Sequence, residues 1–136
     1  MVAEILSVGT ELLLGQIVNS DAQYLSRRLS ELGINVYHHT TVGDNPARVR
    51  EALRQALGRS DLVITTGGLG PTEDDLTKEM VAQELGLDMR LHEPSMRALE
   101  GYFERFGRVM TENNKKQAYF PVGAHVLPNR KGTAPG

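Results

Sequence analysis

Apolar and polar positions along this chain follow two alternating patterns. Short runs dense in valine, isoleucine and other apolar residues are typical of strands, and longer segments with apolar residues every three or four positions are typical of amphipathic helices. The first pattern predicts strands at residues 2–8, 34–42, 61–66 and 124–127. The second predicts helices that begin near residues 20, 46, 72, 94 and 111.

Capping residues mark the ends of several predicted helices. Asn19 is an N-cap type of residue before the first helix, and Gly33 suits the end of that helix. Pro46 fits the first position of the second helix, which we expect Gly58 to stop. Thr72 is placed to cap the third helix. The apolar residues expected on the inward face of that third helix are Leu76, Met80, Val81 and Leu85.

The alternation of strands and helices predicts the fold class. Strands joined by helical crossovers form a mostly parallel sheet with helices on both faces, which is a three-layer α/β architecture. We expect a single domain over residues 1–136. Ligands of such sheets bind beyond the carboxyl ends of the strands. The loops that matter for function are therefore residues 9–19, 42–46 and 66–75.

Three glycines, Gly67, Gly68 and Gly70, follow the third predicted strand. Glycines let the backbone approach a ligand closely and turn with positive φ. The start of a helix close behind them favours an anion such as a phosphate. The alternative is a tight strand-to-helix turn that holds no ligand. Pro71 stands where a Walker A motif needs lysine, and Glu73 where a dinucleotide motif needs glycine, which disfavours a nicotinamide dehydrogenase.

Acidic residues lie in the loops at the same end of the predicted sheet. Asp74 and Asp75 fall in the first turn of the predicted third helix, where a carboxylate stabilises the helix dipole by about 0.3–1 kcal/mol. Beside a phosphate, such a carboxylate can instead hold a magnesium-like ion. Asp44 follows the second strand and is either a helix N-cap or a second metal ligand. Glu11 is either a solvated loop residue or an acid at the mouth of the cleft.

The amino-acid composition disfavours several classes of binding partner. The formal net charge of the chain is −2, whereas a general nucleic-acid binder carries an excess of positive charge. We therefore expect no nucleic-acid partner. The chain has no cysteine, which excludes disulfides and thiolate metal sites and fits a cytoplasmic location. We find no signal peptide and no stretch of membrane-spanning length, so we expect no membrane partner.

Four stretches of the chain resemble the N-terminal domain of the competence- and damage-inducible (CinA) protein family. They are residues 8–19, 65–77, 110–118 and 128–136, and the resemblance covers the whole chain. The first and third stretches make the resemblance specific. The glycine loop alone is shared more widely with molybdopterin-binding proteins of molybdenum cofactor biosynthesis. The resemblance therefore implies a molybdopterin-binding-like fold.

The resemblance also implies an activity. In this family the domain hydrolyses the pyrophosphate bond of ADP-ribose to AMP and ribose 5-phosphate, with a divalent metal ion such as magnesium as cofactor. By position, the metal ligands fall on Asp75 and Asp44, which together with Glu11 are the candidate catalytic residues. The candidate phosphate- and nucleotide-binding residues are Thr66, Gly67, Gly68, Gly70, Thr72, Thr10, Asn19 and Asn114.

Members of the family continue past the sequence at residues 132–136 into a further strand and a loop near the ligand. They often carry a C-terminal nicotinamide mononucleotide deamidase domain, which is absent here. We therefore expect this chain to be truncated at its C-terminal end, to form a homo-oligomer and to bind a small phosphorylated nucleotide or pterin. Two other functions stay open: a nucleotidyl transferase acting on a pterin, and a binding module without catalysis.

Overall fold

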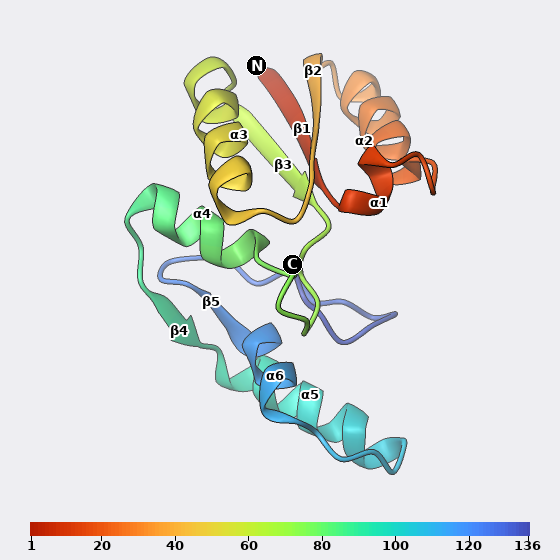
Figure 1. Cartoon of the computed structure of the whole chain (residues 1–136), viewed down its shortest axis with the longest axis vertical. Coiled ribbons are helices and arrows are strands. Elements are labelled where there is room, and N and C mark those ends of the chain that lie inside the picture. Colours follow the sequence, from red (N-terminus) through yellow and green to blue (C-terminus); the bar gives the residue numbers. More distant parts are fainter. The chain divides into compact units, whose positions relative to one another are not determined.

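The computed structural model describes residues 1–136, and its contacts divide the chain into two compact units, Met1–Gly68 and Leu69–Gly136. Each unit contains its own sheet (Figure 1). The single domain expected over residues 1–136 stays a prediction. None of the helices combines the length and the apolar character that crossing a bilayer requires.

The first unit is built on a parallel sheet of three strands in the order β2-β1-β3. β1 spans Val2–Val8, β2 spans Asn35–Val42 and β3 spans Leu62–Thr66. Val8 pairs with Val42, and its neighbour Ser7 pairs with Thr66, so the three strands end at one edge of the sheet. The three predicted strands are confirmed to within one residue at each end, and so is the α/β class with parallel strands.

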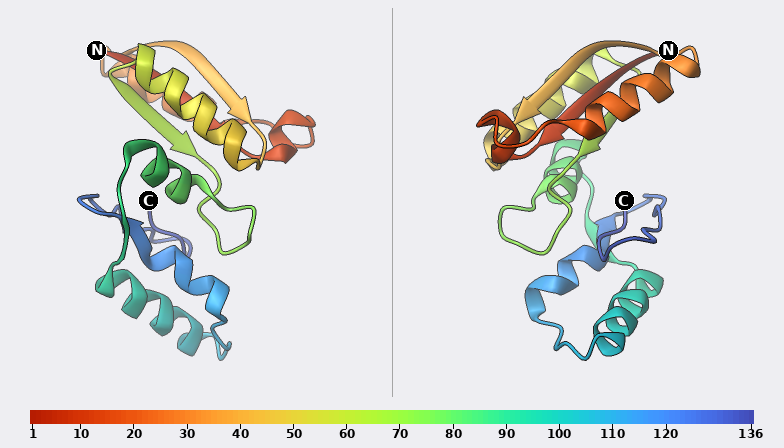
Figure 2. Two further views of the ribbon diagram at one scale, coloured as in Figure 1. Left: turned by 60° about the vertical axis from the view of Figure 1, so that its left-hand side comes forward. Right: turned by 90° about the vertical axis from the view of Figure 1, so that its right-hand side faces the viewer.

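Helices cover both faces of this sheet (Figures 1 and 2). α2 (Ser20–Glu31) packs against β1 and β2, and α3 (Pro46–Arg59) packs on the opposite face against all three strands. The buried cluster under α2 consists of Ala3, Ile5, Ala22 and Leu29. Because successive strand side chains face opposite sides, Glu4, Leu6 and Val8 point toward the α3 face, and all three are buried.

A buried ion pair fixes α3 to the sheet. Glu4 is 0% exposed, and Arg59 donates to it twice, from Nε to Oε2 at 2.8 Å and from Nη2 to Oε1 at 2.7 Å. The Thr40 hydroxyl donates a third hydrogen bond at 2.7 Å. Hydrogen bonding by Arg59 outweighs the effect of burial and, with help from Thr40, holds the pKa of the Glu4 carboxyl below its ordinary value.

Capping explains where the helices of the first unit begin. Asn19 caps α2 and Asn45 caps α3, each accepting a hydrogen bond at 3.1 Å from the backbone N–H three residues later. Pro46 is the first residue of α3, as predicted. The expectation that Gly58 stops this helix is wrong: α3 continues to Arg59, whose pairing with the sheet stabilises the last turn. A short helix, α1 (Thr10–Leu13), follows β1 and was not predicted.

The second unit combines helices with an antiparallel pair of strands (Figure 2). Its elements are α4 (Thr77–Leu85), β4 (Met89–Leu91), α5 (Glu93–Arg105), α6 (Glu112–Lys115), η1 (Lys116–Ala118) and β5 (Tyr119–Pro121). The helix predicted around Pro94 is confirmed as α5. The helix predicted from Thr111 through Ala118 is confirmed as α6 followed by the 3₁₀ turn η1.

The strands of the second unit differ from the prediction. Residues 124–127 form no strand, and the strand of this region is β5, which pairs with the unpredicted β4. Each of these strands has only three residues, too few for an alternating pattern to be recognised. The antiparallel pairing between two separate segments creates them.

The third predicted helix also begins later than expected. α4 starts at Thr77, so Thr72 does not cap it, and Asp74 and Asp75 precede its first turn. The buried residues of α4 are Thr77, Lys78, Met80 and Ala82. The predicted inward face therefore holds for Met80 but not for Leu85, which is 51% exposed. Because the buried residues Thr77 and Lys78 are polar, a search for hydrophobic periodicity does not recognise the inward face of this helix.

Candidate functional site

The carboxyl ends of the strands of the first unit bring three polar side chains together. Asn19 Nδ2 donates to Ser7 Oγ at 2.8 Å, and Thr66 Oγ1 donates to the same oxygen at 3.2 Å. Ser7 is only 1% exposed, so the shared acceptor of these two hydrogen bonds is buried at the carboxyl edge of the sheet. Asn19 thus both caps α2 and holds the end of β1. Ser7 was not among the predicted site residues, because a single serine in a strand carries no spacing signal.

Thr10 and Asp44 lock two neighbouring loops of the first unit to each other. The backbone N–H and the hydroxyl of Thr10 donate to Asp44 Oδ2 at 3.3 and 3.1 Å. The backbone N–H of Asp44 donates back to Thr10 Oγ1 at 3.2 Å. The N-cap alternative for Asp44 is wrong, since Asn45 caps α3. Asp44 instead presents a carboxylate at the edge where the strands end, and its Oδ1 is not used in this lock.

Gly67 passes directly over the end of β1. Its φ is +84°, and a Cβ at this position would lie 2.1 Å from the carbonyl oxygen of Val8. Only glycine fits such an approach. Nearby in the same unit, the Glu11 carboxylate folds back over Gly9, where an added Cβ would lie 2.7 Å from Glu11 Oε1. The predicted residues Thr10, Glu11, Asn19, Asp44, Thr66 and Gly67 therefore gather at one end of the first sheet.

In the second unit, residues 70–75 form a turn closed by the Asp75 carboxylate, which we call the 70–75 turn. Asp75 Oδ2 accepts from the backbone N–H of Thr72 at 2.9 Å and from its hydroxyl at 2.7 Å. Burial raises the pKa of the Asp75 carboxyl, but hydrogen bonds from Thr72 and from the Gly70 amide outweigh it, with Lys116 contributing, so the pKa lies below its ordinary value. Asp75 is therefore an ionised group that shapes this loop.

The structure changes the reason for expecting an anion at the glycines. The dipole argument placed a helix directly after Gly70, but α4 begins only at Thr77. The carboxylates of Asp74 and Asp75 consequently do not stabilise a helix terminus. The features that favour a ligand here are the positive φ angles of Gly67 and Gly68, at +84° and +68°, and the turn that follows them.

Side chains of the α6–η1 segment, residues 112–118, donate hydrogen bonds to backbone carbonyl oxygens of the 70–75 turn. Lys116 Nζ donates to the carbonyl oxygens of Thr72 and Asp75, both at 2.5 Å, and Asn113 Nδ2 donates to the carbonyl oxygen of Pro71 at 3.4 Å. Sequence reasoning selected Asn114 from this segment and missed Lys116. Asn114 Nδ2 instead donates to Thr111 Oγ1, three residues earlier, at 2.7 Å.

Gln117 connects the same segment to the C-terminal stretch of the second unit. It is 1% exposed, and its Oε1 accepts from the Thr133 hydroxyl at 2.7 Å. Its Nε2 donates to the carbonyl oxygen and the side-chain oxygen of Asn114 at 3.4 and 3.3 Å. Residues 70–75, 112–118 and 133 thus form one connected network. Three of the four stretches that resemble the CinA family contribute residues to this network.

The donor atoms around these loops are the oxygens that a magnesium-like ion prefers. Such an ion is commonly held by one or two carboxylates together with phosphate oxygens. Asp44 belongs to the first unit and Asp75 to the second. No group of three or more metal-ligating side chains occurs in the structure. A set of one or two carboxylates plus ligand oxygens is nonetheless compatible with Asp44 or Asp75 as a ligand.

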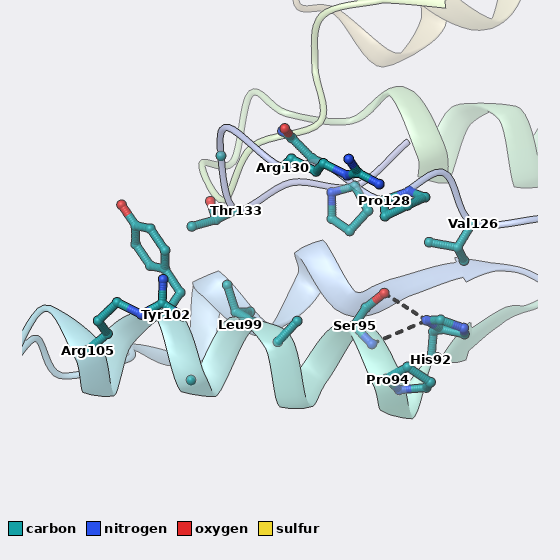
Figure 3. A pocket seen from close by; sticks show the side chains of 15 residues that line it. His92, Pro94, Ser95, Leu99, Tyr102, Arg105, Val126, Pro128, Arg130 and Thr133 are labelled. Atoms are coloured by element: carbon teal, nitrogen blue, oxygen red, sulfur yellow. Dashed lines mark hydrogen bonds between the residues drawn. The ribbon is translucent and has the colours of Figure 1, made fainter.

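A cavity of about 640 Å³ lies in the second unit between α5 and the segment at residues 126–135 (Figure 3). His92 and Ser95 line one end, where Ser95 Oγ lies 2.7 Å from His92 Nδ1. Tyr102 and Arg105 lie toward the other end of α5, and Arg130 lies on the facing segment. None of the predicted site residues lines this cavity.

Comparisons with known proteins agree with this picture. The family described as "Probable molybdopterin binding domain" matches residues 4–133. A CinA-like protein from Dictyoglomus turgidum is 61% identical over all 136 residues, which make up 33% of that relative. The crystal structure of a CinA protein of unknown function from Thermoplasma acidophilum has a TM-score of 0.90 and 35% identity, covering 99% of this chain and 79% of that one. A molybdopterin biosynthesis protein from Mycobacterium abscessus has a TM-score of 0.57 and 25% identity, covering 78% and 65%.

The parallel sheet, the glycine turn at its carboxyl edge and the family match define a domain of the molybdopterin-binding class. Within that class, the chain belongs to the CinA family. It spans about a third of the length of the curated relatives that it matches.

Proposed function

We propose that this domain binds a phosphorylated nucleotide at the glycine turn and hydrolyses the pyrophosphate bond of ADP-ribose or a related nucleoside diphosphate sugar. The observation that carries the proposal is the lock between Thr10 and Asp44 at the same sheet edge where Gly67 passes over Val8. The Asp44 carboxylate and the glycine backbone thus lie at the same carboxyl edge of the sheet. Ligands of parallel sheets bind at this edge.

The roles of the residues follow from their chemistry. Backbone N–H groups of Gly67, Gly68 and Gly70 hold a phosphate of the substrate. The carboxylate of Asp44 in the first unit, or that of Asp75 in the second, is the proposed ligand of a divalent ion, which would supply charge neutralisation and an activated water. In the reaction, a water oxygen bonds to one phosphorus and gives up a proton to solvent, the P–O bond of the bridge breaks with its electron pair going to the leaving phosphate oxygen, and AMP and ribose 5-phosphate leave. Glu11, whose carboxylate lies over Gly9 in the first unit, is the further candidate catalytic acid.

Turnover of ADP-ribose tests the proposal. The purified chain is incubated with ADP-ribose, with and without Mg²⁺, and AMP is measured by chromatography. Asp44→Asn and Asp75→Asn keep an acceptor oxygen for the hydrogen bonds from Thr10 and Thr72 but remove the charge. Each change should lower turnover at least about a hundredfold, the usual scale for losing a group that stabilises a transition state.

Asp61→Asn is the matched control. Asp61 Oδ2 accepts a hydrogen bond from the backbone N–H of Val2 at 2.8 Å, so this carboxylate lies at the opposite end of the same sheet. Turnover in this variant should equal that of the wild type. Wild-type turnover in both Asp44→Asn and Asp75→Asn would exclude the metal role of these carboxylates.

A second function is favoured by the comparisons, because the family description and the Mycobacterium abscessus neighbour both refer to molybdopterin. In this alternative the same loops bind an adenylated pterin and move its nucleotidyl group. The assay with adenylated pterin in place of ADP-ribose separates the two functions. Binding of either ligand without turnover would support a binding module without catalysis.

A further inference from the structure

The 70–75 turn is held by a lysine that sequence reasoning did not select. Lys116 Nζ donates to the backbone carbonyl oxygens of Thr72 and Asp75. These are the same two residues whose side-chain and amide hydrogen bonds close the turn. One ammonium group therefore binds two backbone oxygens of the turn. Hydrogen bonds with a charged donor are about twice as strong as those between neutral groups.

A second lysine holds the backbone from which Lys116 extends. Lys78 of α4 is 9% exposed, and its Nζ donates to the carbonyl oxygens of Lys116 at 3.3 Å and Gln117 at 3.0 Å. The same ammonium lies 4.2 Å from the centre of the Phe120 ring. Burial lowers the pKa of Lys78 to about 8. A lysine with so little access to water is unavailable to a ligand and serves the packing of η1.

We propose that Lys116 is a positioning residue for the 70–75 turn, and that Lys78 fixes η1 so that Lys116 reaches that turn. Lys78 orders the α6–η1 segment, Lys116 orders the turn, and the turn presents its amides and the Asp75 carboxylate in one arrangement. This inference rests on the proposed binding of phosphate at the turn.

The consequence for ligand binding is preorganisation. A loop that is already ordered before the ligand arrives loses less conformational freedom on binding. Removing the Lys116 ammonium deletes both hydrogen bonds that it donates to the turn, and part of the lost free energy appears as weaker ligand binding. The affinity for an anion should then fall about tenfold, because each factor of ten corresponds to about 1.4 kcal/mol. The ammonium need not touch the ligand for this effect to arise.

The test compares Lys116→Met with Lys115→Met. Each change replaces the lysine with an unbranched apolar side chain and removes one ammonium group from neighbouring positions. Lys115 pairs with the exposed side chain of Glu112 and donates no hydrogen bond to the 70–75 turn. The first measurement is hydrogen exchange of the Thr72 amide without ligand, since this N–H donates to Asp75. The second is the affinity for inorganic phosphate, followed through the amide signals of Gly67, Gly68 and Gly70.

In Lys116→Met, exchange of the Thr72 amide should accelerate about tenfold and phosphate should bind about tenfold more weakly. Lys115→Met should match the wild type in both measurements, and Lys78→Met should accelerate the exchange as well. Unchanged exchange in Lys116→Met and Lys78→Met would overturn the inference. So would faster exchange with undiminished phosphate affinity. A wild-type chain that binds no phosphate at these amides would refute the proposed function, while the exchange data would still decide whether the lysines order the turn.

Discussion

Replacing Gly67 with alanine tests the close approach on which the site depends. The φ of +84° costs an L-residue about 1–2 kcal/mol. The added Cβ would also lie 2.1 Å from the carbonyl oxygen of Val8. Neither the Val8 carbonyl nor the Gly67 backbone can move away without disturbing the paired ends of β1 and β3. Overpacking of this kind costs about 1–3 kcal/mol. The two contributions together predict a loss of about 2–5 kcal/mol in the free energy of unfolding.

Urea unfolding of the wild type and of Gly67→Ala measures this loss, and Gly58→Ala is the matched control. Gly58 lies within α3, and a Cβ there would meet no atom within 4 Å. Alanine at this position should stabilise the chain by about 0.5–1 kcal/mol, because glycine is a poor helix former. The same substitution should therefore have opposite signs at the two positions. If Gly67→Ala is as stable as the wild type, glycine is not required where the chain passes over Val8.

Three further outcomes follow from the buried polar groups. Arg59→Met leaves the buried Glu4 carboxylate without its charged partner and should lower the free energy of unfolding in urea by about 2–3 kcal/mol. Breaking a fully buried pair costs about 3–5 kcal/mol, and the expected loss is smaller here because Arg59 is 40% exposed. The pKa of Glu4 is lowered in the folded state, so this stabilisation is present above pH 4.5 and is lost as the pH falls below it, and the cost of Arg59→Met should shrink in acid. Lys78 has its pKa lowered from 10.5 to about 8, so the wild type should gain up to about 3 kcal/mol between pH 8 and pH 10.5 relative to Lys78→Met; a constant difference over this range would contradict it. Asn19→Ala removes both a helix cap and the contact to Ser7 and should cost about 1–2 kcal/mol in thermal or urea unfolding.

Several features of the fold could be read from the sequence because their causes are local. β1 and β3 appear as dense apolar runs, and the cap at Asn19 and the helix start at Pro46 depend only on residues within one turn of the chain. The role of Gly67 is also local in origin, since a glycine directly after a buried strand is a common sign of a close backbone approach. The positions of Asp44 and Asp75 in the loops after the strands made them candidate metal ligands, and the family resemblance added the activity that such an ion would serve.

The remaining features were decided by contacts between distant residues. Thr10 and Asp44 are 34 positions apart, and Lys116 lies 44 positions from Thr72, so no local pattern links them. Asp75 was expected in the first turn of a helix, but its carboxylate accepts hydrogen bonds from Thr72 and closes a turn before the helix begins. The sequence alone determined the three parallel strands and the helices α2, α3 and α5, because backbone preference and hydrophobic periodicity act over a few residues. The short strands β4 and β5 depend on their pairing with each other. Tertiary structure decided which polar groups meet, because only folding brings partners together that lie dozens of residues apart.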